Sequence, residues 1–179
     1  MNFNILESYA MSNSDIFKVI GKSSVIKYPQ FGSMSHIDEC FDSQGRCVIF
    51  FETVSNKVGH WECLYKDGTT INFFDSYGIG PDVARKYLSK TTQINLKETK
   101  PLLTNLIKKS GYDCIYSGFD YQSWKGNVET CGKHVSIRLL NKDKSNEDYY
   151  DYLQSEKDKL NVDTFDEVVE ELIYNFIGK

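Results

Sequence analysis

The chain has 179 residues and a formal net charge of −4, with 40% hydrophobic and 26% charged residues. This composition is ordinary for a globular protein of one domain, and the acidic balance argues against a surface built to bind DNA. No apolar run approaches the roughly 18 residues of a membrane span, so we expect no membrane partner. No basic stretch followed by an apolar one marks a signal peptide at the start.

The first third of the chain predicts one short helix and then two extended segments. Residues 15–20 follow the cap residues Ser12, Asn13 and Ser14 and precede Gly21, which predicts a short helix. Residues 25–29 end in proline and are expected to be extended. Residues 46–51 form a continuous apolar run, which is typical of a strand buried on both faces.

A β-hairpin is the strongest local prediction. Strands at 59–65 and 69–75 flank Asp67-Gly68, and such a pair favours a two-residue type I′ turn. With Asp67 and Gly68 as the loop, the ladder pairs Trp61 with Phe74 and His60 with Asp75. Directly opposed residues hold their Cβ atoms about 4.5–5.5 Å apart. The turn therefore predicts an imidazole beside a carboxylate.

The rest of the chain predicts helices separated by short strands or extended segments at 114–116 and 119–121. Four helices are expected at 80–88, 101–109, 131–140 and 146–157. A last helix begins at the capping box Thr164-Phe165-Asp166-Glu167 and carries one apolar stripe that should dock on the domain, made of Phe165, Val168, Val169, Leu172, Ile173 and Phe176.

Five cysteines without paired spacing indicate reduced thiols, and the absence of CxxC and HxxxH argues against a metal site. Cys131 is the best candidate nucleophile, because it opens the predicted helix 131–140. A cysteine at a helix N-terminus beside a protonated histidine is more readily a thiolate. Cys63, the rival cysteine, falls on the Trp61 face and suggests packing. His134, the rival base, has no predicted carboxylate partner and is expected beside the site or at the surface.

Several motifs together resemble the adenovirus-type (adenain-like) cysteine proteases and their relatives, which process SUMO-like modifiers or mature the capsids of giant viruses and virophages. The similarity covers about residues 45–140 and rests on the order Gly59-His60-Trp61, Phe73-Phe74-Asp75-Ser76-Tyr77-Gly78, Gln122 and Thr130-Cys131-Gly132. Lys133-His134-Val135 and Arg138 after Cys-Gly are most similar to the virophage and giant-virus branch.

The resemblance implies a papain-like α+β fold, with a small mixed or antiparallel sheet flanked by helices and the nucleophile at the start of a central helix. It implies one protease domain over 1–179, with a core at 45–140 and a helical extension at 146–177. Cys131 would attack the substrate, His60 would be the base and Asp75 would orient it. Gln122 would be the side-chain donor to the oxyanion, with Asn127 as the alternative donor.

Trp61 and Trp124 are expected to contact substrate, and no cofactor is required. The resemblance implies an endopeptidase that cuts viral capsid or core precursors near glycine during virion maturation, in the cytoplasmic viral factory of the host and in the virion. Two alternatives stay open: a deconjugating protease acting on the C-terminus of a ubiquitin-like modifier, and an inactive binding module of the same fold. The adenovirus relative is activated by DNA, which the acidic charge argues against here. The sequence identifies no activating peptide.

Overall fold

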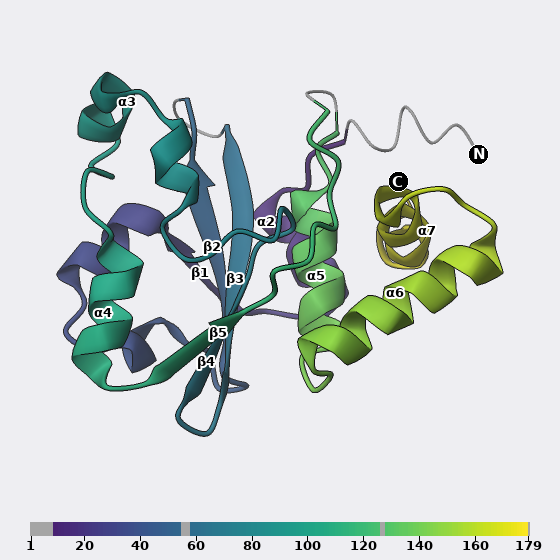
Figure 1. The fold of residues 1–179 in the computed structure, drawn as a ribbon, viewed down its shortest axis with the longest axis horizontal. Helices are drawn as coiled ribbons and strands as arrows, with labels where there is room; N and C mark the ends of the chain where they lie inside the picture. The colour runs from purple at the N-terminus through teal and green to yellow at the C-terminus, as the bar shows by residue number, and fades with distance from the viewer. Residues whose placement is uncertain (1–8, 55–57, 126–127, 179) are drawn as a thin grey trace. The chain divides into compact units, whose positions relative to one another are not determined.

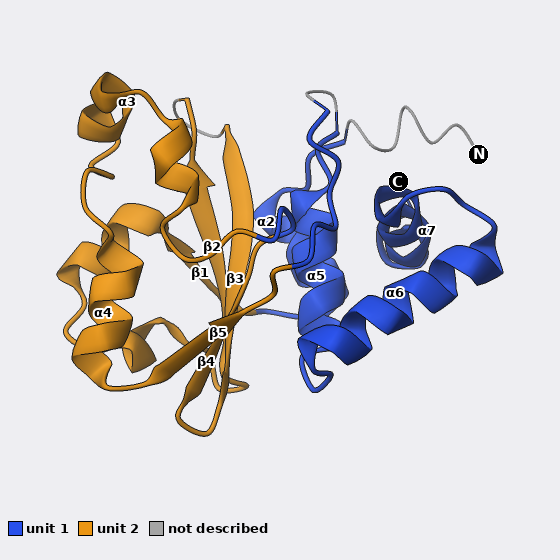
Figure 2. Cartoon of the chain, in the orientation of Figure 1, with its two compact units in different colours: residues 1–22, 76–78, 119–179 blue, residues 23–75, 79–118 orange. Residues whose placement is uncertain are grey.

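A computed structural model describes residues 9–54, 58–125 and 128–178. The chain divides into two compact units, shown in different colours in Figure 2. The sheet unit comprises residues 23–75 and 79–118, and the helical unit comprises residues up to 22, 76–78 and 119 onward. The expectation of a single protease domain stays a prediction.

The sheet unit is built on a five-stranded mixed sheet with the order β1-β2-β3-β4-β5. The central strands β2, β3 and β4 are antiparallel, whereas β1 runs parallel to β2 and β5 runs parallel to β4. This arrangement confirms the predicted α+β class with a small mixed sheet and helices. The bounds of the strands are β1 Ser24–Lys27, β2 Arg46–Glu52, β3 Gly59–Asp67, β4 Thr70–Phe74 and β5 Asp113–Tyr116.

One face of the sheet carries the core of this unit. Helix α4 (Leu102–Ser110) and the 3-10 helix η1 (Tyr28–Ser33) contribute to that core, and α4 lies beside the strands in Figure 1. The second 3-10 helix, η2 (Ile37–Cys40), packs there too. Burying this many aliphatic and aromatic side chains is the main favourable term for the unit. The strand residues in the core include Ile49, Phe51, Leu64, Ile71 and Phe73.

A distant aspartate caps helix α4. Pro101 at the N-cap offers no side-chain hydrogen bond, so the first amides of the helix need another acceptor. The Asp82 carboxylate accepts hydrogen bonds from the Leu103 amide at 3.2 Å and the Thr104 amide at 2.8 Å. The Tyr28 hydroxyl also donates to Asp82 and accepts from the Leu102 amide at 3.0 Å. The cap therefore links α4 to η1.

The predicted helix at 80–88 is wrong. Asp82 has a φ of 63°, in the left-handed region, which interrupts a right-handed helix started at Pro81. Only the 3-10 turn η3 (Ala84–Tyr87) forms there, followed by a helix that was not predicted, α3 (Lys90–Asn95). Of the two segments predicted to be short strands or extended, 114–116 lies within β5, whereas 119–121 is not part of a strand.

Within its described residues, the helical unit contains four helices: α2 (Asn13–Ile20), α5 (Cys131–Leu140), α6 (Asn146–Leu160) and α7 (Phe165–Ile177). Helix α5 packs against α2 and α7, and α6 packs against α7 (Figure 1). The helix predicted at 131–140 is confirmed at both ends. Val168, Val169 and Ile173 of the predicted α7 stripe are fully buried, but Phe176 is 47% exposed and lies outside the packed face. None of the helices in the described ranges has the length and apolarity to span a membrane.

A buried acid without a partner lies after α3. Both carboxyl oxygens of Glu98 are buried and have no hydrogen-bond partner among the described residues. Burial, with a smaller effect of Glu52, raises the pKa of Glu98 to about 8.

We expect Glu98 to make the stability of the protein fall with rising pH. The pKa of Glu98 is about 8 in the folded chain and about 4.3 in an unfolded one, so stability is lost between these two values. Glu98→Gln should remove this loss, so the variant gains stability relative to the native chain between about pH 4.5 and 8. Thermal unfolding across this range measures the effect. Asp67→Asn, at the exposed last residue of β3, should show no such gain, and parallel pH profiles for Glu98→Gln and the native chain would contradict the prediction.

Candidate functional site

A hydrogen-bonded histidine–aspartate pair lies where the central hairpin ends. His60 belongs to β3 and Asp75 directly follows β4. Nε2 of His60 and Oδ2 of Asp75 are 2.9 Å apart, and Asp75 is only 1% exposed. A buried carboxylate on one ring nitrogen selects the tautomer and stabilises the protonated ring. The structure thus brings the predicted imidazole and carboxylate together, while their catalytic role stays a prediction.

The predicted register of the hairpin is wrong by two residues. The ladder pairs Asp67 with Thr70 and Cys63 with Phe74, so Gly68 and Thr69 form the loop instead of Asp67 and Gly68. Because side chains alternate between the faces of a sheet, a shift of two leaves His60 and Asp75 on the same face. The two residues are diagonal instead of directly opposed, and a diagonal neighbour is still within reach of a long side chain.

Glu62 is a site residue that the sequence reasoning missed. Continuing the observed ladder by one residue places Asp75 opposite Glu62. Glu62 is 2% exposed, and its carboxyl group shares a hydrogen bond with Asp75. Burial first, and then the charge of Asp75, raise the pKa of Glu62 well above its usual range. Glu62 lies two residues after His60, so both side chains are on the same face of the strand, and this was the available signal. The wrong register placed Asp75 opposite His60 and so hid the pairing of Asp75 with Glu62.

The same three residues have the ligand types of a cation site. One ligand atom each from His60, Glu62 and Asp75 lie within 4.8 Å of one another. However, Asp75 is already hydrogen-bonded to His60, and the pKa of Glu62 is raised well above its usual range, which favours its neutral form. This arrangement balances the buried charge without a cation, because a neutral acid and a carboxylate carry one negative charge opposite the imidazole.

The opposite face of β3 carries packing residues. Trp61 is buried, and its ring centroid lies 4.6 Å from that of Phe50. Cys63 is fully buried on the same face. None of the five cysteines, all within described parts of the chain, forms a disulfide. The contact of Trp61 with substrate stays a prediction.

Cys131 is the first residue of α5 and is 9% exposed. Thr130, at the N-cap, makes no side-chain cap, since its hydroxyl donates to Asp166 instead. The sulfur therefore lies at the end of the helix where the dipole and the first amides favour negative charge.

Gln122 lies in a closely bonded loop. Its amide oxygen accepts from the Ser76 hydroxyl at 2.7 Å, and its amide nitrogen donates to the Val128 carbonyl at 3.1 Å. These contacts determine the orientation of the amide and use one of its two N–H groups. The role of Gln122 as an oxyanion donor stays a prediction. Asn127, the alternative donor, lies outside the described residues.

Trp124 is the exposed aromatic residue of this loop. Its side chain is 56% exposed and stacks on Tyr77, with ring centroids 4.1 Å apart. The indole nitrogen donates to Asp120 at 3.1 Å. An exposed indole whose orientation is fixed by stacking and a hydrogen bond is suited to contact a peptide. The contact of Trp124 with substrate stays a prediction.

The interpretation of His134 as a residue without a carboxylate partner is wrong. His134 is fully buried, and its Nε2 lies 3.0 Å from Oδ1 of Asp166 in α7. Asp166 also accepts from the Thr130 hydroxyl and from the Ser123 amide at 2.9 Å. Burial alone would raise the pKa of Asp166, but the bonds to His134, Thr130 and Ser123 outweigh it and hold this pKa below its usual range. Sequence separation hid this partner.

A buried ion pair also joins these two helices. Lys133 of α5 binds Glu170 of α7, and both side chains are fully buried. The Lys133 ammonium also donates to the Tyr9 carbonyl at 2.9 Å. Asp166 and Glu170 are four residues apart, so they lie on one face of α7. The helix that begins with Cys131 is therefore held to α7 by a buried ion pair and a buried hydrogen bond.

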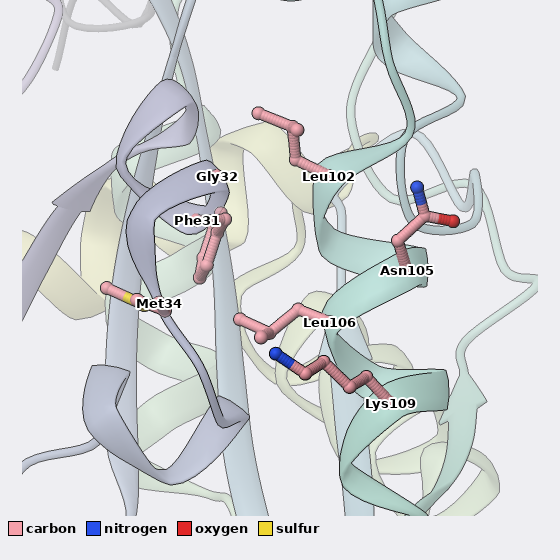
Figure 3. Close-up of a pocket in the computed structure, with 7 residues that line it drawn as sticks. All are labelled: Phe31, Gly32, Met34, Leu102, Asn105, Leu106 and Lys109. Carbon is pink, nitrogen blue, oxygen red and sulfur yellow. The ribbon is translucent and has the colours of Figure 1, made fainter.

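A hollow in the sheet unit lies between η1 and α4 (Figure 3). Its lining is mainly apolar and contains none of the predicted site residues. The residues that line it are Phe31, Gly32, Met34, Leu102, Asn105, Leu106 and Lys109.

The chain is similar in sequence to a virophage protein and has a weak likeness to a solved structure. No protein-family model matches the chain. Uncharacterized protein V9 of Sputnik virophage is 34% identical over 136 residues, which cover 75% of this chain and 77% of that protein. The C-terminal Ulp1 protease domain, solved in complex with Smt3, the yeast ortholog of SUMO, aligns at a TM-score of 0.38 and 16% identity, over 99% of this chain and 83% of the other.

Gly59, directly before His60, should tolerate no side chain. A Cβ there would collide with the Phe51 carbonyl oxygen and lie 2.7 Å from the Phe50 ring. Gly59→Ala should therefore destabilise the protein by about 1–3 kcal/mol, measured by urea unfolding. In the same unit, Gly118→Ala is a matched control, since no atom lies within 4 Å of its Cβ. Equal stability of the two variants would refute the steric explanation.

Asp166→Ala should destabilise the chain by about 3 kcal/mol or more. The substitution leaves His134, the Thr130 hydroxyl and the Ser123 amide without their shared acceptor, and buried groups left unpaired are costly. Denaturant unfolding measures the loss. Asp151→Ala, at an exposed position of α6, is the control and should change stability by no more than about 0.5 kcal/mol. A loss for Asp166→Ala no larger than the control's would show that these contacts do not hold α7.

Proposed function

We propose that this chain, which belongs to the family of uncharacterized protein V9 of Sputnik virophage, is a cysteine protease with Cys131 as nucleophile and His60 as base. The observation that carries the proposal is the hydrogen bond of 2.9 Å between His60 and the buried Asp75. The position of Cys131 at the start of α5 supports it, because the dipole and the first amides of a helix favour negative charge there.

In the proposed reaction, the Cys131 thiolate attacks the scissile carbonyl carbon and forms a tetrahedral oxyanion. The Cys131 amide and the Gln122 side chain are the proposed donors to that oxyanion. Nδ1 of protonated His60 gives its proton to the departing amine, and the C–N bond breaks to leave a thioester. Neutral His60 then takes a proton from water, which attacks the thioester and releases the acid product and the thiolate. Asp75 holds the ring through Nε2 in both steps.

The proposed substrates are viral capsid or core precursor proteins, cut near glycine during virion maturation. The virophage origin of the related protein supports a viral setting. The proposed places of action are the viral factory in the host cytoplasm and the virion. The net charge of −4 supports a protein partner in preference to DNA.

The direct test compares the native chain with Cys131→Ala when each is co-expressed with candidate precursors from the same virus. We expect precursors to be trimmed only by the native chain, because Cys131→Ala removes the nucleophile. Cys114→Ser, which changes an exposed cysteine on β5, is the matched control and should trim as the native chain does. Gel mobility and mass spectrometry of the precursors identify the cut sites.

Iodoacetamide labelling at pH 6 tests the nucleophile without a substrate. An activated thiolate at Cys131 should react at least about tenfold faster than Cys114, and His60→Ala should remove the difference. Precursors trimmed equally with and without Cys131 would refute the proposal. Cleavage confined to fusions of a ubiquitin-like modifier would favour a deconjugating protease. Neither cleavage nor fast labelling would indicate an inactive binding module.

A further inference from the structure

The hydrogen bond between Glu62 and Asp75 requires a shared proton. Two ionised carboxylates have no donor between them, so one of the two groups must be a neutral acid. Both residues are almost fully buried, which makes two adjacent negative charges more costly still. One ligand atom of each lies within 4.8 Å of the other and of a His60 ring nitrogen. The three side chains therefore form one hydrogen-bonded chain in the sheet unit.

The proton belongs on Glu62. Asp75 lies against Nε2 of His60, and a protonated imidazole favours the ionised form of its partner. Glu62 is farther along the chain of hydrogen bonds, and burial first and the Asp75 charge second raise its pKa well above the usual range. Asp82 adds a further negative potential there.

Of the groups around Glu62, the His60 imidazole lowers the pKa of Glu62, but by less than burial and the Asp75 charge raise it. Ile49 is opposite Glu62 on β2, and Cys47, the titratable neighbour on the same face of that strand, has its own pKa raised by burial. The Tyr28 hydroxyl of η1 donates to Asp82, and burial and Asp82 raise the pKa of Tyr28 far above its usual value.

We propose that Glu62 is a positioning residue for the His60–Asp75 pair: as a neutral acid it donates a hydrogen bond to the Asp75 carboxylate and holds it toward Nε2 of His60. A carboxylate held from both sides has less freedom to rotate, so the imidazole is fixed in one orientation. The consequence for catalysis rests on the proposed function, whereas the placement of the proton does not.

Two variants of Glu62 separate a proton donor from a residue that only fills space. Glu62→Gln keeps the shape and an N–H that can donate to Asp75. Glu62→Met keeps similar volume but has no donor. Leu64→Met, two residues along β3 on the same buried face, is the control for repacking. Urea unfolding confirms that each variant is folded before the other measurements.

The first readout is the titration of the His60 ring, followed by NMR of ¹³C-labelled histidine and assigned by its loss in His60→Gln. If Glu62 is neutral, Glu62→Gln changes no charge, and the pH midpoint of the ring should stay within about 0.3. If Glu62 is ionised, the same substitution removes a negative charge beside the ring and should lower the midpoint by about 1 or more. The second result would overturn the proposal.

The second readout is cleavage of a precursor that the native chain trims. Glu62→Gln should keep kcat within about threefold, and Glu62→Met should lose on the order of tenfold in kcat with KM little changed, as one hydrogen bond to a charged group is lost. Native kcat in Glu62→Met, or equal losses in both variants, would refute a positioning role. If no protein cleaves any precursor but the His60 midpoint is unchanged in Glu62→Gln, the proposed protease function fails and the assignment of the proton to Glu62 holds.

Discussion

The buried carboxylate of Asp75 is the group on which the candidate chemistry depends. It lies directly after β4, and it is bonded to His60 on one side and to Glu62 on the other. A buried negative charge is tolerable only when it is paired and hydrogen-bonded. The hairpin provides both partners because β3 carries them two residues apart, on one face of the sheet.

The helical unit uses the same kind of pairing. Helix α5 brings Lys133 and His134 into the interior, and α7 presents Glu170 and Asp166 to them. Lys133 is thus paired with Glu170, and His134 is hydrogen-bonded to Asp166. Asp166 also accepts a hydrogen bond from the hydroxyl of Thr130, the residue before Cys131. Buried polar pairs of this kind favour one position of α7 on α5, because a shift of α7 would leave the buried groups unpaired. In this unit the C-terminal helix is a support for the helix that begins with Cys131.

Local sequence patterns predicted the bounds of a helix well where residues next to its end determine where it begins. The capping box at Thr164 begins α7 as expected, and the helix from Cys131 to Leu140 has the predicted bounds. The prediction at 80–88 was wrong because Asp82 serves as the cap of α4, twenty residues away in sequence, and takes a left-handed φ to do so. The residues next to Asp82 in the sequence give no sign that it caps a distant helix.

By itself, the sequence determined that His60 and Asp75 share a face of a hairpin and that Cys131 begins a helix. The first conclusion survived a register error of two residues because the alternation of side chains has a period of two. Only the tertiary structure decided that Glu62 lies beside Asp75 and that Asp166 lies beside His134. Those contacts depend on the strand register and on helix packing, which bring together residues that are 13 and 32 positions apart in the chain.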